Sequence, residues 1–182
     1  MILSNYLDME NGPLWAACRT NGYSYGVSFD FDFRTNLVLL AINQCSQLKM
    51  AYRSALKTLI DLVVDEKRIE AARNLTICML TESVATLGRA TAISLRSYLN
   101  TYSIEKYQSL LNEVKNYQYN ETKMRMIIER YVVPLVNDDQ QSSSTLILVN
   151  TNKMKETRDF LVKECRISDV VLVKDIVQHL CR

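Results

Sequence analysis

The chain has 182 residues, of which 48% are hydrophobic and 23% are charged, and this composition is typical of one globular domain with a substantial core. Its 22 basic and 20 acidic residues leave a net charge of +2. So small a charge provides no broad electrostatic attraction to nucleic acid or anionic lipid, and it argues against both classes of partner.

Cysteine usage and the N-terminal residues favour an intracellular protein. The five cysteines are scattered and include no C-x-x-C pair, so neither a zinc ribbon nor a disulfide framework is expected. The N-terminal residues lack the basic and apolar regions of a secretory signal. No stretch reaches the roughly 20 apolar residues that a membrane span needs. We therefore expect reduced thiols and an intracellular location, cytoplasmic or mitochondrial.

The first predicted elements are the tail of a helix, a helical turn and a long strand. Residues 2–9 place apolar side chains at helical spacing, and Gly12 with Pro13 is expected to stop this helix. Residues 14–19 are predicted to form a short helical turn. From residue 23 to 33, apolar and polar residues alternate strictly, and a period of two is typical of a strand with one apolar face.

A hairpin and a run of helices are predicted next. Residues 37–42 are continuously apolar, which favours a strand that is either covered on both faces or paired centrally in a sheet, and that forms a β-hairpin with residues 23–33. The predicted helices are residues 46–63 with Ser46 as the cap, residues 69–99 with Gly88 as a point of bending or division, residues 104–117, and a segment capped by Asn120 and ended by Pro134.

The last part of the chain returns to alternating strands and helices. Residues 145–150 are predicted to be a buried strand, residues 153–165 an amphipathic helix, residues 170–173 a short strand and residues 176–180 a helical turn. This order predicts an α+β fold, in which an antiparallel or mixed β-sheet packs helices on one face.

The segment from residue 12 to 26 resembles a known peptidase motif. The letters GPLW, then Arg19, then GYSYG are similar to the R-x-x-G-x-x-Y-G signature of the M16 zinc metallopeptidases, the pitrilysin, insulysin and presequence-protease group. In those enzymes the signature lies in the non-catalytic C-terminal half. The order of predicted elements also resembles an M16 lobe. The resemblance implies a single lobe over residues 1–182, truncated at its N-terminus so that the first strand of the family is missing.

The resemblance also implies that zinc belongs to another part of the enzyme. M16 catalysis needs an inverted His-x-x-Glu-His motif and a further glutamate to hold Zn²⁺. This chain has one histidine, His179, so we expect no metal ligands, no catalytic residues and no activity from the chain alone. Zinc is expected in a zinc-bearing N-terminal half, which is either part of the same polypeptide or a separate subunit.

Arg19, Tyr25, Gly22 and Gly26 are the candidate substrate-binding residues. The resemblance implies that the arginine and the tyrosine reach across a closed chamber to the peptide bound in the other half. A guanidinium offers five donors, and a phenol one, toward a carbonyl that gains negative charge. Strict alternation places Tyr25 on the same face as Phe29, so Tyr25 needs a bulge near Gly26 to leave a helix-covered face.

Other interpretations of these residues stay open. Arg19 is otherwise a solvated charge on a turn, Tyr25 a core aromatic and Trp15 a packing anchor. The neighbouring Asp30 and Asp32 share the polar face of the strand, where solvated carboxylates are expected.

Two functions follow from the resemblance. The first is a substrate-binding, chamber-closing lobe of an M16-type zinc metalloendopeptidase. Its expected partners are a peptide substrate and a zinc-bearing half, and neither nucleic acid nor a membrane is expected as a partner. The second is a degenerate M16-like lobe that acts as a structural or protein-interaction subunit. If the sheet topology differs from that of the family, an unrelated α+β binding domain is the third interpretation.

Overall fold

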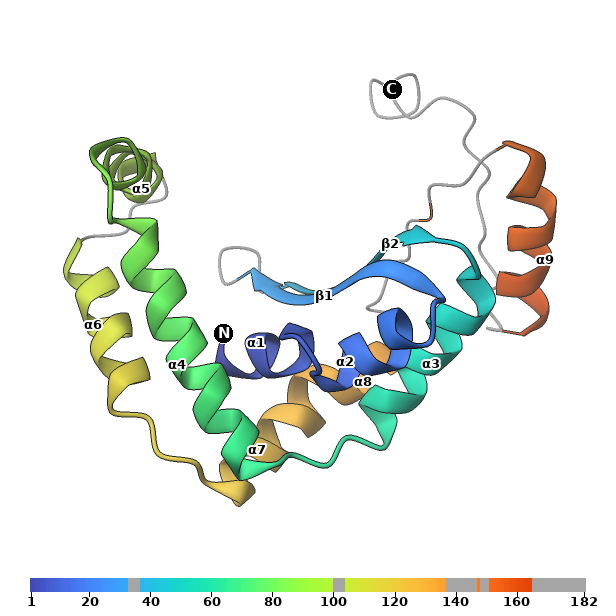
Figure 1. Ribbon diagram of the computed structural model, residues 1–182, viewed down its shortest axis with the longest axis horizontal. Helices are drawn as coiled ribbons and strands as arrows, with labels where there is room; N and C mark the ends of the chain where they lie inside the picture. Colours follow the sequence, from blue (N-terminus) through green and yellow to red (C-terminus); the bar gives the residue numbers. More distant parts are fainter. Residues whose placement is uncertain (33–36, 100–103, 137–146, 148–150, 165–182) are drawn as a thin grey trace. The chain divides into compact units, whose positions relative to one another are not determined.

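The computed structural model describes residues 1–32, 37–99, 104–136, 147 and 151–164 (Figure 1). The chain divides into two compact units, Met1–Val133 and Pro134–Arg182. The single lobe expected over residues 1–182 stays a prediction. The predicted strands at 145–150 (apart from Ile147) and 170–173, the turn at 176–180 and His179 all lie outside the described residues.

Three short helical elements open the first unit. They are α1 (Ile2–Asp8), α2 (Pro13–Trp15) and the π-helical η1 (Ala16–Thr20). Pro13 occupies the first position of α2, where its missing N–H costs nothing because that donor has no intrahelical partner. The predicted end of the first helix before Gly12 and the predicted helical turn are both confirmed.

Gly12 is needed at the turn between α1 and α2 because the backbone leaves no room for a side chain. A Cβ atom at this position would lie 2.7 Å from the carbonyl oxygens of Tyr6 and Met9. The preceding Asn11 has a φ of 62°, a left-handed conformation that asparagine tolerates better than most residues. The glycine therefore serves close packing of the chain on the end of α1.

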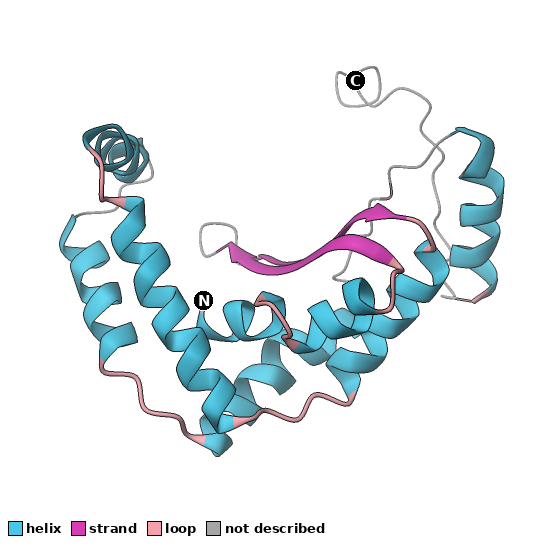
Figure 2. Cartoon of the chain, viewed as in Figure 1, coloured by secondary structure: helices cyan, strands magenta, loops and turns pink. Residues whose placement is uncertain are grey.

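The predicted β-hairpin is confirmed. Strands β1 (Ser24–Asp32) and β2 (Leu37–Cys45) pair antiparallel, and the register runs from Ser24 opposite Cys45 to Asp32 opposite Leu37. Within the described residues, β1 and β2 form a two-stranded sheet, and most of the other described residues are helical (Figure 2). Helices combined with an antiparallel sheet agree with the predicted α+β class.

Of the two alternatives expected for β2, coverage on both faces is wrong. Leu37 and Leu39 are 62% and 58% exposed. Helices α1, α2 and η1 contact β1, and α3 (Leu48–Ile60) contacts β2. In Figure 1 the neighbouring N-terminal helices lie on one side of the hairpin. The continuous apolar sequence of β2 therefore does not mean that both of its faces are buried.

The N-cap of α3 is one residue later than predicted. Gln47 is the N-cap of the helix, and the Ser46 hydroxyl is used elsewhere. Its Oγ lies 3.0 Å from the Gly22 carbonyl oxygen and 3.1 Å from the Tyr23 carbonyl oxygen, and it donates its hydrogen to one or the other. The prediction that Ser46 caps the helix is therefore wrong, because this hydroxyl ties the end of the hairpin to the glycine turn.

The predicted long helical segment is divided into α4 (Glu66–Ser83) and α5 (Leu87–Leu99). Asp65 caps α4 by accepting a hydrogen bond from the Lys67 N–H at 2.9 Å. Thr86 accepts a bond from the Arg89 N–H at 3.3 Å at the start of α5. The division between the helices thus precedes Gly88, which lies inside α5. The residue that satisfies a free N–H at the start of α5 is Thr86 and not the glycine.

The final helices of this unit are α6 (Ile104–Lys115), α7 (Glu121–Ile127) and the π-helical η2 (Ile128–Val132), followed by α8 (Val133–Val136) at the boundary of the units. Asn120 caps α7 as predicted, accepting from the Lys123 N–H at 2.9 Å.

Pro134 does not end the helical segment, so that prediction is wrong. Helix α8 follows the π-helical residues directly, and the proline is its second residue. A missing N–H donor is tolerated in the first turn of a helix.

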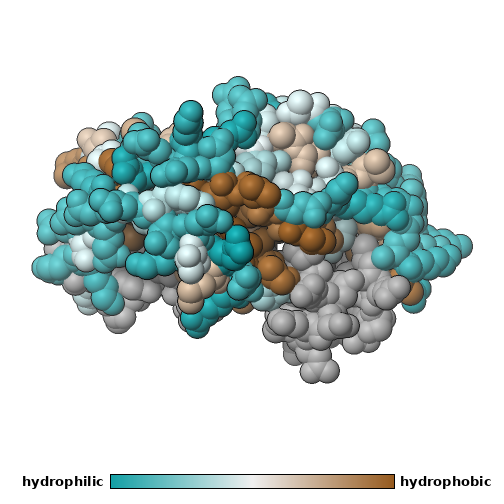
Figure 3. All heavy atoms as spheres, turned by 90° about the horizontal axis from the view of Figure 1, so that it is seen from below, coloured by the Kyte–Doolittle hydropathy of each residue, from teal (hydrophilic) through white to brown (hydrophobic). Residues whose placement is uncertain are grey.

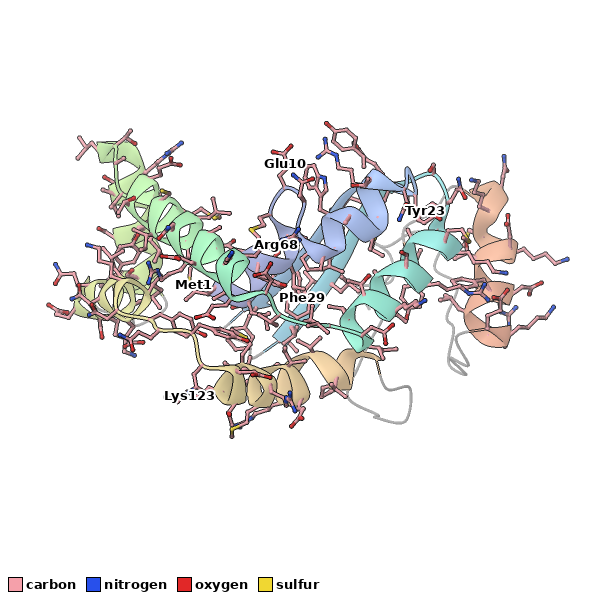
Figure 4. All side chains as sticks on the ribbon, turned by 60° about the horizontal axis from the view of Figure 1, so that its bottom comes forward. Met1, Glu10, Tyr23, Phe29, Arg68 and Lys123 are labelled. Atoms are coloured by element: carbon pink, nitrogen blue, oxygen red, sulfur yellow. The ribbon has the colours of Figure 1, made fainter. Side chains whose placement is uncertain are left out.

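The core of the first unit forms where α1 meets α4 and β1. Tyr6 is 2% exposed, and its hydroxyl donates to the Val63 carbonyl and accepts from the Asp65 N–H at 3.2 and 3.1 Å. Phe29 of β1 is 3% exposed, whereas Lys123 on α7 lies at the periphery (Figure 4). Hydrophilic side chains cover most of the surface in Figure 3, around a hydrophobic area across the middle of that face.

The second unit contains η3 (Thr151–Lys153) and α9 (Met154–Lys163) among its described residues. Phe160 and Leu161 of α9 are buried, which confirms the predicted amphipathic helix. In the part of the chain that the structure describes, no helix combines the length and apolar character needed to cross a membrane.

Candidate functional site

The predicted unit of helical turn, glycine and strand forms a tight backbone turn. Gly22 has a φ of 70°, in the left-handed region that glycine adopts without steric cost. Its N–H donates to the carbonyl of Arg19, and the Tyr23 N–H donates to the carbonyl of Cys18, both at 2.9 Å. The turn therefore joins the end of η1 directly to the start of β1.

This turn brings Arg19 and Tyr25 together. The Arg19 Cζ atom lies 4.6 Å from the centroid of the Tyr25 ring. It also lies 4.0 Å from the centroid of the Trp15 ring, which stands four residues earlier and so on the same side of the helical segment. We call these three residues the arginine stack. Cation–π attraction of this kind contributes about 0.5–1 kcal/mol at exposed sites.

Tyr25 is 64% exposed, although it shares strand parity with the buried Phe29. The predicted bulge is not the reason, since the register is the same on both sides of Tyr25, from Ser24 to Gly26. The register places Gln44 of β2 opposite Tyr25, and Gln44 has a positive φ of 49°. The tyrosine is therefore outside the core and free to contact Arg19.

Gly26 has no steric requirement for glycine in this structure. A Cβ atom there would meet the Asn43 Cβ at 3.7 Å, an ordinary contact distance. Of the two predicted site glycines, Gly22 therefore shapes the turn, and Gly26 is a position where a small side chain fits.

The Arg19 guanidinium is not used to satisfy the end of its own helical segment. Asn21 Nδ2 donates to the Ala16 and Ala17 carbonyl oxygens at 3.2 and 3.0 Å, and the Ser54 hydroxyl donates to Ala17 at 2.9 Å. Among the residues that the structure describes, no carboxylate lies within ion-pair distance of Arg19. Its N–H groups remain available to a ligand.

Two cysteines contact Tyr23 at the glycine turn. The Cys18 thiol is fully buried, its Sγ donates to the Ala51 carbonyl at 3.6 Å, and burial together with nearby Cys45 raises its pKa to about 11. The Cys45 thiol donates to the Tyr23 carbonyl at 3.3 Å. Because the thiolate is the reactive form, Cys18 is a packing residue and not a nucleophile.

The described residues contain no group of three or more His, Cys, Asp or Glu side chains that could hold a metal ion. Asp30 is exposed, as expected for a residue on the polar face of the strand. The single histidine, His179, lies outside the described residues.

A separate hollow of about 580 Å³ lies beside α4, and its lining includes Arg73 and Tyr117. The Arg73 side chain donates from Nη1 to the Tyr117 carbonyl at 3.2 Å and pairs with Glu70 at 3.5 Å. Its charge is therefore already balanced, and the hollow contains none of the predicted site residues.

The contact made by a half-buried carboxyl on α1 was not predicted from the sequence. Both oxygens of Asp8 accept from the Phe29 N–H, at 2.8 and 2.9 Å, which fastens α1 to β1. Burial raises the pKa of Asp8 to about 7, the hydrogen bond from Phe29 opposes that rise, and the charge of Asp30 adds to it. No local pattern marks this contact, because its partners are far apart in sequence.

Trp15 is the site residue whose role the sequence interpretation missed. Its position four residues before Arg19 was the available signal, since that spacing brings two helical side chains together.

No protein-family model, no curated protein and no solved structure matches this chain. The M16 resemblance therefore rests on the motif and on the order of the elements.

Proposed function

We propose that this chain is the non-catalytic, substrate-binding lobe of an M16-type zinc metalloendopeptidase. The observation that supports the proposal is the meeting of Arg19 and Tyr25 across the Gly22 turn, with Tyr25 64% exposed. The motif that carries the resemblance thus corresponds to a continuous structural unit. Peptide hydrolysis is then a property of the whole enzyme, and zinc is supplied by the other half.

In this role the lobe holds the substrate and helps to close the chamber. The guanidinium of Arg19 and the phenol of Tyr25 donate hydrogen bonds toward the peptide main chain, where a carbonyl oxygen gains negative charge during hydrolysis. Gly22 sets the distance between them because it allows the tight turn. The expected cytoplasmic or mitochondrial location belongs to the same proposal.

The test is reconstitution with a zinc-bearing M16 half. Wild-type chain, Arg19→Ala and Tyr25→Phe are each mixed with that half, and cleavage of a fluorogenic peptide is measured. Arg125→Ala is the matched control, because Arg125 is an exposed arginine on α7 that pairs with Glu121 at 3.1 Å. We expect activity with wild type and the control, and at least about a tenfold loss with Arg19→Ala. Equal activity from all versions would remove Arg19 and Tyr25 from any part in the reaction.

A second candidate is a degenerate lobe that acts as a structural or protein-interaction subunit. The exposed Leu37 and Leu39 on β2 favour it, since apolar side chains on an open strand suit contact with another protein. The same mixtures distinguish the two functions. A stable complex without peptidase activity from any version supports the second.

A further inference from the structure

The arginine stack determines how a ligand can approach Arg19. The Arg19 Cζ atom lies over the Trp15 ring at 4.0 Å from its centroid and over the Tyr25 ring at 4.6 Å, so the guanidinium contacts both rings. The five N–H donors of an arginine lie in the plane of that group. A ligand must therefore meet Arg19 through the N–H donors that the two rings leave uncovered.

The charge of Arg19 lacks a carboxylate partner within the described part of the chain. Asn21 supplies the hydrogen bonds to the helix-end carbonyls that an arginine at this position could otherwise make. A planar fork of donors with no counter-charge, on a half-buried residue, matches a planar anion that accepts two hydrogen bonds. A carboxylate has this shape, with two acceptor oxygens in one plane.

We propose that Arg19 binds a carboxylate of the peptide substrate, and that Trp15 is the positioning residue that holds the guanidinium for it. This inference rests on the proposed function, because it specifies which class of peptide the substrate-binding lobe prefers. The carboxylate belongs to the C-terminus of the peptide or to an acidic side chain, and the two sources present the same chemistry.

Trp15 contributes by orienting Arg19 before the ligand arrives. A long side chain that is already held in one orientation loses less conformational freedom on binding. Trp15 is also the only tryptophan of the chain. Its fluorescence therefore reports directly on events at the guanidinium.

The test is a titration of the full 182-residue chain with short acetylated peptides, followed by Trp15 fluorescence. One pair of peptides differs only in a C-terminal carboxylate or amide. A second pair, amidated at the C-terminus, differs only in a central aspartate or asparagine. We expect one acidic peptide to bind at least about tenfold more tightly than its neutral counterpart, and the pair that shows this preference identifies the source of the carboxylate.

Arg19→Lys keeps the charge but removes the planar fork, so we expect the preference for the acidic peptide to disappear, while Arg125→Lys retains it. Calorimetric titration replaces fluorescence for Trp15→Leu. In that variant we expect the ratio of acidic to neutral affinity to fall severalfold. A purely structural role for Trp15 would lower the melting temperature and leave that ratio unchanged.

Equal affinities for acidic and neutral peptides, or no binding of any peptide, would overturn the inference. If reconstituted peptidase activity still depends on Arg19 in that case, the proposed function stands and only the carboxylate preference is wrong. If the acidic preference is present but reconstitution is independent of Arg19, the carboxylate site stands and the peptidase role is wrong.

Discussion

The two ends of β1 have the same alternation but opposite surroundings. Phe29 is 3% exposed beneath the helices, and its N–H is held by Asp8 of α1. Tyr25, four residues earlier on the same strand, is 64% exposed and contacts Arg19. A period of two identifies residues that share a face, but it does not show where the helical layer covering that face ends. The uncovered end is where the candidate site lies.

The largest expected effect separates these two aromatics. Phe29→Ala should destabilise the fold by about 3–5 kcal/mol, because it opens a cavity in the core. Tyr25→Ala should cost less than about 1 kcal/mol, since it removes an exposed ring and one cation–π contact. Urea denaturation followed by circular dichroism measures both. Similar costs for the two substitutions would show that the two ends of β1 do not differ as described.

The next effect compares two glycines. Gly12→Ala should cost about 2–3 kcal/mol, since the added Cβ would lie 2.7 Å from backbone oxygens that cannot move aside as a side chain could. Gly26→Ala should be nearly neutral, because its nearest contact is at 3.7 Å. Thermal unfolding of both variants checks the difference, and a stable Gly12→Ala protein would refute the close packing at the end of α1.

A pH-dependent effect is expected at Asp8, on the buried side of the comparison. Because burial raises its folded pKa from 3.8 to about 7, the folded state binds this proton more tightly than the unfolded state. The stability that this carboxyl contributes is full below 3.8 and decreases as the pH rises to about 7.

Asp8→Asn should therefore remove this decrease and stabilise the protein above the folded pKa, on the order of 1 kcal/mol once partial exposure is allowed for. Unfolding free energies measured across the pH range give the result. A variant with the same pH dependence as wild type would mean that Asp8 does not titrate as described.

The smallest effect tests the turn that supports the exposed end. Gly22→Ala should cost about 1 kcal/mol because its φ of 70° disfavours residues with a Cβ atom. Gly22→Asn should cost less, since asparagine visits this region more readily. Stability is measured as above. Equal costs would indicate that the turn can relax to a negative φ.

Local pattern predicted much of the fold. Apolar spacing and the Asn120 cap gave correct helices, and strict alternation predicted β1. The wrong predictions concern residues whose surroundings are determined by contacts with distant parts of the chain. Ser46 bonds to the glycine turn instead of capping α3, and Leu37 and Leu39 are apolar but exposed.

The candidate site divides in the same way. The proximity of Arg19 and Tyr25 follows from a left-handed glycine between a helical turn and a strand, which the sequence displays. The exposure of Tyr25 does not follow from the sequence, because it depends on how far the helical layer extends along β1. The Asp8 contact depends on a residue 21 positions away, so no local signal could predict it.

A double-mutant cycle on peptide affinity tests the central claim most directly, namely that Arg19 and Tyr25 act together on one ligand. Affinities of wild type, Arg19→Ala, Tyr25→Ala and the double variant are measured by calorimetric titration with the preferred peptide. We predict that the double variant binds little more weakly than Arg19→Ala, with a coupling of about 0.5–1 kcal/mol or more. Losses that simply add, or no loss in either single variant, would contradict the account.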